Sequence, residues 1–141
     1  MEYFVCDDTV VVRIKRGEEV LSELEKLCEK LKITAATVEG IGAADKITVG
    51  LYSVKKKEYF KKTFEGDFEI TSLLGNITTK DKKPYLHLHI NFADSELKTF
   101  GGHLNECKIC ATAEIFIKSL PCKLKRFHDE ETGLNLFLPK A

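Results

Sequence analysis

The sequence predicts an α+β fold: a large, mainly antiparallel, barrel-like sheet with one main amphipathic helix packed on it. Three observations support this fold class. One stretch places apolar residues at helical spacing, while several others are rich in β-branched residues or alternate apolar with polar side chains. Many of these strand-like stretches are joined by short, turn-like connections, which favour antiparallel pairing over parallel crossovers.

The helix is expected between residues 18 and 31, with Gly17 marking its start. Acidic residues are frequent in its first turn, where the helix dipole favours negative charge. The opposite face is charged, so one apolar stripe remains to pack on a sheet. That stripe consists of Val20, Leu21, Leu24, Leu27, Cys28 and Leu31.

Nine other segments are expected to be strands, and glycine-containing stretches are expected to separate several of them. The predicted strands are 9–14, 34–39, 46–52, 58–64, 68–79, 85–92, 98–100, 110–118 and 123–127. Residues 40–45 are expected to form a loop, Gly66-Asp67 a break, and Gly101-Gly102 a tight turn. At about 150 residues per domain, the 141 residues predict one domain over 1–141.

Composition limits the class of protein. The chain has 22 Lys+Arg and 22 Asp+Glu residues, so its net charge is zero. This balance argues against DNA binding driven by the overall charge of the molecule. No apolar run approaches the roughly 20 residues of a membrane span, so no membrane contact is expected. The first eight residues are acidic where a signal peptide would be basic. The number of cysteines, five, is odd, so at least one cannot pair within the chain and no disulfide scaffold is indicated. We therefore expect a cytoplasmic protein.

The histidines carry the main chemical signal. In residues 85–92 apolar side chains alternate with polar ones, so His87 and His89 share one face of a strand, about 6.6 Å apart. His103 follows Gly101-Gly102, and a tight turn there would bring it close to that strand. Three imidazoles leave one position open on a zinc ion, as in sites that bind or activate a small molecule. The alternative is an exposed polar sheet face that ends in a hairpin turn.

Two other features allow both a functional and a purely structural interpretation, and a third is expected to be structural only. Glu114 lies in a strand and is either an acid/base or hydrogen-bonding group beside a ligand, or an outward residue of an edge strand. Cys107 and Cys110 have the spacing of a redox or metal pair, but they enter a strand, which favours a structural role. His128 lies among charged residues and is expected to be solvated.

Several of these motifs together resemble the PPC (plants-and-prokaryotes-conserved) domain. The resemblance depends on His87-x-His89, followed by Gly101-Gly102-His103 and by the stretch that contains Glu114. It extends over nearly the whole chain. The other motifs that fit are Arg13-x3-Gly17-Glu18, Gly40-Ile41-Gly42-Ala43, Phe64-Glu65-Gly66-x-Phe68-Glu69-Ile70, Ser72-Leu73-x-Gly75-Asn76 and Glu131-Thr132-Gly133-Leu134.

The resemblance implies a homotrimer with a divalent transition metal, expected to be zinc, on His87, His89 and His103. Such a protein would be a ligand-binding or interaction module, with Glu114, Gly101 and Gly102 as candidate residues for a small-molecule ligand. Plant members of the family hold DNA through an attached AT-hook, whose Arg-Gly-Arg-Pro core does not occur in this sequence. DNA is therefore a weakly supported partner.

The fold also resembles that of acetolactate decarboxylase, a zinc enzyme with three histidine ligands. This likeness gives an alternative function, a zinc-dependent enzyme that acts on a small carbonyl or carboxylate substrate.

Overall fold

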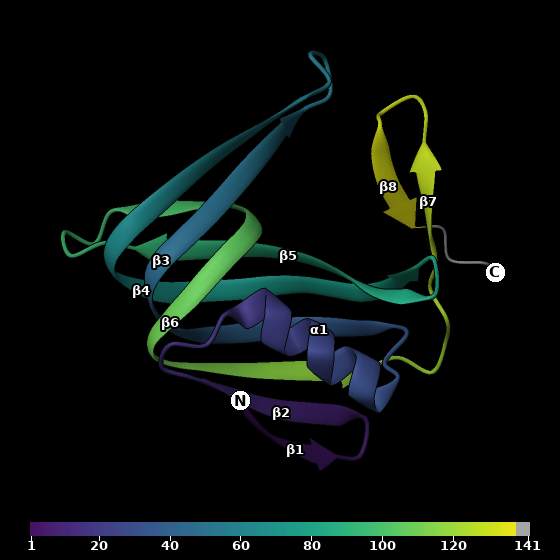
Figure 1. The fold of residues 1–141 in the computed structure, drawn as a ribbon, viewed down its shortest axis with the longest axis horizontal. Helices are drawn as coiled ribbons and strands as arrows, with labels where there is room; N and C mark the ends of the chain where they lie inside the picture. The colour runs from purple at the N-terminus through teal and green to yellow at the C-terminus, as the bar shows by residue number, and fades with distance from the viewer. Residues whose placement is uncertain (138–141) are drawn as a thin grey trace.

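A computed structural model describes residues 1–137 as a large antiparallel sheet with one helix against it (Figure 1). The predicted α+β class is therefore confirmed. The elements are β1 (Glu2–Cys6), β2 (Thr9–Lys15), α1 (Val20–Leu31), β3 (Ala36–Ser53), β4 (Glu58–Lys80), β5 (Lys83–Ala93), β6 (Thr99–Ser119), β7 (Arg126–Asp129) and β8 (Leu134–Phe137).

The main sheet has the strand order β1-β2-β6-β3-β4-β5, and the beginning of β6 also pairs with β5. Because β6 pairs with both β3 and β5, strands β3 to β6 form a partial ring. Strands β7 and β8 form a separate hairpin that stands beside the projecting end of the β3–β4 hairpin (Figure 1). The helix is too short and too polar to span a membrane, and it is the only helix among residues 1–137.

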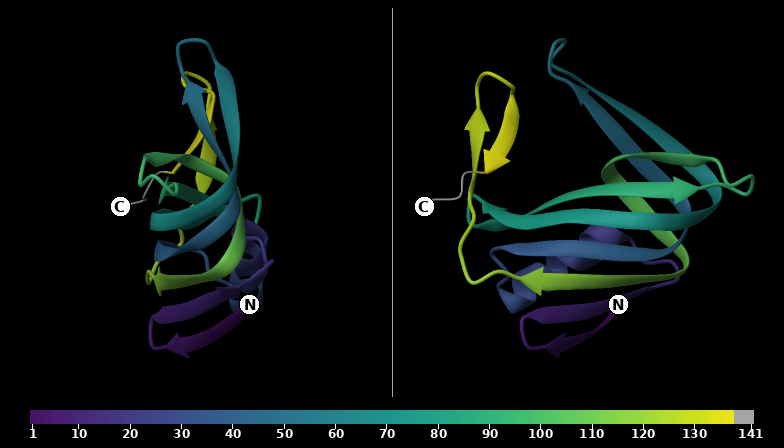
Figure 2. Two further views of the ribbon diagram at one scale, coloured as in Figure 1. Left: turned by 90° about the vertical axis from the view of Figure 1, so that its left-hand side faces the viewer. Right: turned by 180° about the vertical axis from the view of Figure 1, so that it is seen from behind.

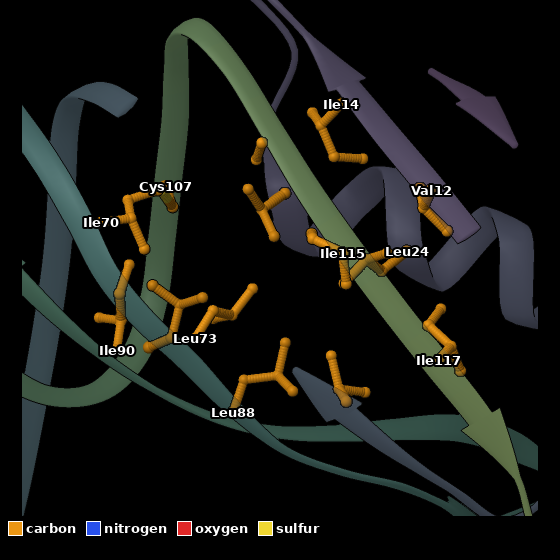
Figure 3. Close-up of a cluster of buried hydrophobic side chains, with 14 of the residues drawn as sticks. Val12, Ile14, Leu24, Ile70, Leu73, Leu88, Ile90, Cys107, Ile115 and Ile117 are labelled. Atoms are coloured by element: carbon orange, nitrogen blue, oxygen red, sulfur yellow. The ribbon is translucent and has the colours of Figure 1, made fainter. Parts of the chain in front are cut away.

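The core lies between α1 and the sheet. Val20, Leu24, Leu27 and Cys28 of the predicted stripe are buried. They pack in one apolar cluster with alternate residues of the strands, such as Ile115 and Ile117 (Figure 3). Seen from the side away from the helix, the opposite face of the sheet is open (Figure 2, right).

The helix begins later than its glycine suggested. Gly17 adopts a φ of +85° in the turn before the helix, and its N–H donates to the Ile109 carbonyl. The side chain of Glu19 then accepts hydrogen bonds from the backbone N–H groups of Leu21 and Ser22, so Glu19 is the N-cap. Gly17 therefore directs the chain toward the helix and does not start it.

The predicted breaks inside the long strands are wrong. Residues 40–45 belong to β3, Gly66-Asp67 to β4 and Gly101-Gly102 to β6. The strands continue because bulges absorb the irregular residues: register shifts occur at Gly40/Gly42 and at Ala44/Lys46. A Cβ on Gly42 would lie 2.7 Å from the Ala113 Cα, so this glycine allows close approach of β6 and not a loop.

The chain ends also differ from the prediction. Strands β1 and β8 were not predicted, and the strand expected over 123–127 is replaced by β7, which begins at Arg126.

Candidate metal centre

The strand register brings the three predicted histidines together. His87 and His89 alternate along β5, and His89 lies directly opposite His103 of β6. The ring centroids are 5.2 Å apart for His87–His89 and for His87–His103, and 5.5 Å apart for His89–His103. One potential ligand nitrogen from each ring lies within 4.8 Å of the others.

Gly101 and Gly102 act differently from the prediction. The predicted tight turn is absent, because both residues pair within the β5–β6 ladder. A Cβ on Gly101 would lie 2.7 Å from the Ile90 carbonyl oxygen, and one on Gly102 would lie 2.9 Å from the Gly50 carbonyl oxygen. The glycines therefore allow β6 to lie close to β5 and β3, and the ladder itself carries His103 to His89.

The histidines line a cavity of about 480 Å³. Its other walls come from the ends of β3 and β4, from β5, and from the β7–β8 hairpin. The lining residues are Gly50, Leu51, Tyr52, Tyr59, Tyr85, His87, His89, Gly102, His103, Arg126, Leu134, Asn135 and Leu136. The set is mostly aromatic and aliphatic, and a few polar groups converge in it, as is typical of small-molecule sites.

Arg126 is the charged residue of this cavity that sequence reasoning missed. This residue is only 7% exposed. Its guanidinium donates from Nε to the Thr78 hydroxyl at 2.9 Å, and from Nη2 to Asn76 Oδ1 at 2.8 Å. Nη1 donates to the Asn135 carbonyl at 2.7 Å, and Nη2 also lies 3.3 Å from His87 Nδ1. Arg126 thus joins the β7–β8 hairpin to the histidine strand.

The site favours the neutral form of His87 and His103. Burial, followed by the positive charge of Arg126, lowers the pKa of His87 to about 4. The pKa of His103 is also lowered, first by burial and then by His89 and Arg126. Neutral imidazole is the form that offers a lone pair to a metal ion.

The three rings fit a metal ion in number and chemistry. A tetrahedral zinc ion with bonds of about 2.0–2.1 Å holds its ligand nitrogens about 3.3 Å apart. The ligand atoms of the three rings all lie within 4.8 Å of one another, which is not far from that spacing. The cluster is therefore compatible with metal binding.

The other residues singled out in the sequence lie apart from this cavity. Glu114 is exposed and does not line it, and its strand is not an edge strand, because Glu114 pairs with Arg13 of β2 and with Ile41 of β3. His128 is exposed, and its Nε2 lies 3.8 Å from the Glu130 carboxylate.

The surroundings of Cys107 and Cys110 favour a structural role for both cysteines. Cys107 is buried in the core, whereas Cys110 is partly exposed, and an odd spacing in a strand directs the two side chains to opposite faces. Burial raises the pKa of Cys107 to about 12, which disfavours the reactive thiolate.

Solved structures similar to this chain include three that it matches over nearly their whole length. A metal-containing protein from Archaeoglobus fulgidus is 34% identical, with a TM-score of 0.87 and coverage of 97% of this chain and 96% of the other. A protein from Bacteroides thetaiotaomicron named as a candidate DNA-binding protein is 29% identical, with a TM-score of 0.94 and coverage of 96% and 95%. A plant- and prokaryote-conserved (PPC) protein from Pyrococcus horikoshii is 29% identical, with a TM-score of 0.86 and coverage of 99% and 96%.

More distant matches share less. Acetolactate decarboxylase from Bacillus subtilis subspecies spizizenii is 15% identical with a TM-score of 0.54, which shows a likeness of fold alone. The "Bifunctional protein GlmU" of Synechococcus sp. (strain JA-3-3Ab) is 30% identical over 134 residues, 92% of this chain and 20% of that protein. The chain thus spans about a fifth of the length of the curated relatives it matches.

Residues 1–121 match the sequence family described as the Plants and Prokaryotes Conserved (PCC) domain. The match covers the helix and all six strands of the main sheet, including the three histidines. The chain therefore belongs to the Plants and Prokaryotes Conserved (PCC) domain family.

Proposed function

We propose that this protein is a homotrimeric, metal-binding module of the cytoplasm that takes a small-molecule ligand at its metal. The metal is a divalent transition ion, with zinc expected, on His87, His89 and His103. The observation that carries the proposal is the convergence of three imidazoles in a cavity of about 480 Å³. Three protein ligands leave a position open on a tetrahedral ion, and the cavity gives a ligand room to occupy it.

The experiment is elemental analysis of protein purified without added metal or chelator. We expect about one metal ion per chain in the wild type and close to none in a His87→Ala, His89→Ala double variant, because one imidazole alone holds zinc weakly. His128→Ala is the matched control, since His128 is exposed and is not one of the three clustered histidines, and it should keep the wild-type content. Equal metal content in the wild type and the double variant would refute the proposal.

The open face of the sheet supports self-association. Residues in direct register across the strands share a face, and one such row contains Phe4, Val11, Phe116 and Leu74 in addition to Glu39 and His89. Phe4, Phe116 and Leu74 are 68%, 44% and 54% exposed in the single chain. Further copies of the chain would cover these apolar side chains.

An enzymatic role is the second candidate. An ion on three neutral histidines can polarise a carbonyl or carboxylate group bound at its open position. Cobalt-substituted protein reports such binding through its visible spectrum. A panel of small 2-oxo and 2-hydroxy acids that leaves that spectrum unchanged would count against this role.

A further inference from the structure

The cavity has an unbalanced positive charge. Arg126 is the only charged residue in its lining, and none of the lining residues, all in the described part of the chain, is an Asp or Glu. Outside the lining, Lys61 adds positive charge near His103. A divalent ion on three neutral imidazoles would bring two more positive charges, and no acidic group of the cavity wall would offset them.

Among residues 1–137, Arg126 has only neutral partners. Its hydrogen bonds go to Thr78, Asn76 and the Asn135 carbonyl, and no carboxylate among residues 1–137 lies within 4.0 Å of its guanidinium. The guanidinium also stacks on Tyr85 at 4.7 Å and on Phe137 at 5.3 Å. Buried charges in proteins are generally paired, and a bound anion would supply the counter-ion that residues 1–137 do not provide.

The walls indicate what else the anion contains. Leu51, Leu134 and Leu136 lie around the cavity with three tyrosines, which offer apolar surface and ring faces to a ligand. Phosphate groups are typically held by several guanidinium or backbone N–H donors, whereas this cavity offers a single guanidinium. The surroundings therefore favour one carboxylate on an apolar body over inorganic phosphate or a nucleotide.

We infer that the histidine cavity binds a small organic carboxylate, whose negative charge lies between the metal site and Arg126 and whose apolar body contacts the leucine and tyrosine walls. This inference deepens the proposed function, since it names the class of ligand for the same cavity. Arg126 is then the residue that selects anions, and this selection is a matter of binding, whether or not the protein is an enzyme.

The test compares two ligands of the same shape. Benzoate and its neutral counterpart benzamide are titrated by calorimetry into zinc-loaded and metal-free wild-type protein. In the zinc-loaded protein we expect benzoate to bind at least about tenfold more tightly than benzamide, because only benzoate offsets the positive charge. In the metal-free protein we expect a smaller preference of the same sign, which comes from Arg126 alone.

The outcomes separate the two proposals. Protein that retains one zinc per chain but binds both ligands equally would overturn the anion inference and leave the metal site standing. Protein that retains no zinc but still prefers benzoate would overturn the metal site and leave the anion inference standing. Absence of benzoate binding in both forms would overturn the inference outright.

A variant tests the assignment to Arg126. Arg126→Gln removes the charge and keeps hydrogen-bonding capacity, so benzoate affinity should fall about tenfold, whereas benzamide affinity should stay the same and zinc content should not fall below one ion per chain. Arg13→Gln is the matched control, because Arg13 is exposed and on β2, and it should bind benzoate as the wild type does. An Arg126→Gln protein with wild-type benzoate affinity would contradict the assignment. If this variant does not fold, the comparison of benzoate with benzamide in the wild type still decides the inference.

Discussion

At the scale of single residues, the ring of His87 has two competing roles, as a hydrogen-bond acceptor for Arg126 and as a ligand of a metal ion. Arg126 Nη2 lies 3.3 Å from His87 Nδ1, a contact that requires a lone pair on Nδ1 to be a hydrogen bond. Neutral imidazole has one lone pair for this purpose and one N–H. An ion held at Nε2 would therefore place the proton on Nδ1 and turn the contact into one between two donors.

The first prediction concerns the balance between metal affinity and folding. Arg126→Gln should raise zinc affinity roughly tenfold, because it removes a positive charge beside the ion. The same change should lower the free energy of unfolding by about 3 kcal/mol, because it disrupts a buried hydrogen-bond network. Competition with a chelator and chemical denaturation measure the two effects. Changes of the same sign in both would contradict this interpretation of Arg126.

The second prediction is a pH dependence of the metal-free protein. His87 has a pKa lowered to about 4 in the folded state, with Arg126, His89 and His103 as the neighbouring charged or titratable groups. The unfolded chain therefore binds more protons between pH 6.5 and 4, and stability should fall as the pH falls through that window. Denaturant midpoints across this range should decline less steeply for His87→Gln than for the wild type. An equally steep decline would show that other groups are responsible.

The sequence predicted the histidine cluster better than the rest of its cavity. Strict alternation in β5 placed His87 and His89 on one face, and that pattern is local. Arg126 lies 39 residues after His87, and its position depends on where the chain goes after β6. No spacing or periodicity in a single sequence encodes that return.

At the scale of elements, glycines explain most errors in the predicted strands. A glycine usually signals a turn, so the sequence suggested loops at Gly40–Asp45 and at Gly101-Gly102. In the structure these residues remain in the ladder, where they permit bulges or close approach of neighbouring strands. Local signals cannot distinguish these roles, since the difference lies in what the next strand does.

The third prediction concerns Gly75 of β4. Gly75 lies opposite Leu88 of β5, next to the position where Asn76 lies opposite His87. A Cβ on Gly75 would clash with the His87 carbonyl oxygen and the Leu88 Cα, and both are backbone atoms that cannot rotate away. Gly75→Ala should cost about 2 kcal/mol of unfolding free energy and reduce zinc content. Lys62→Ala, at an exposed position of the same strand, is the control and should change neither. Wild-type stability and zinc content in Gly75→Ala would show that β4 can shift without disturbing His87.

At the scale of the whole molecule, the fourth prediction concerns assembly. Light scattering should give a mass three times that of the 15.9 kDa chain. Phe116 belongs to the row of exposed apolar residues on the open face of the sheet and lies opposite Glu39. Phe116→Glu should lower the mass, because a second carboxylate there would have to be buried between copies of the chain. Phe60→Glu, a similarly exposed phenylalanine outside that row, should leave the mass unchanged. Equal masses for the two variants would exclude this face as the contact.

The overall architecture was predictable to the extent that it depends on periodicity. The stripe of α1 and the β-branched strands gave the correct class, because each pattern buries one face. The partial ring of β3 to β6 requires β6 to pair with β5 first and with β3 afterwards. That switch of partner is a long-range property, because it depends on where three strands far apart in the sequence come to lie.

The most direct test of this account is an anomalous diffraction map, recorded at the zinc edge from crystals of protein purified without added metal. We expect one peak per chain, about 2.0–2.1 Å from a ring nitrogen of each of His87, His89 and His103. A peak held by other residues, or fully ordered rings without any peak, would contradict it.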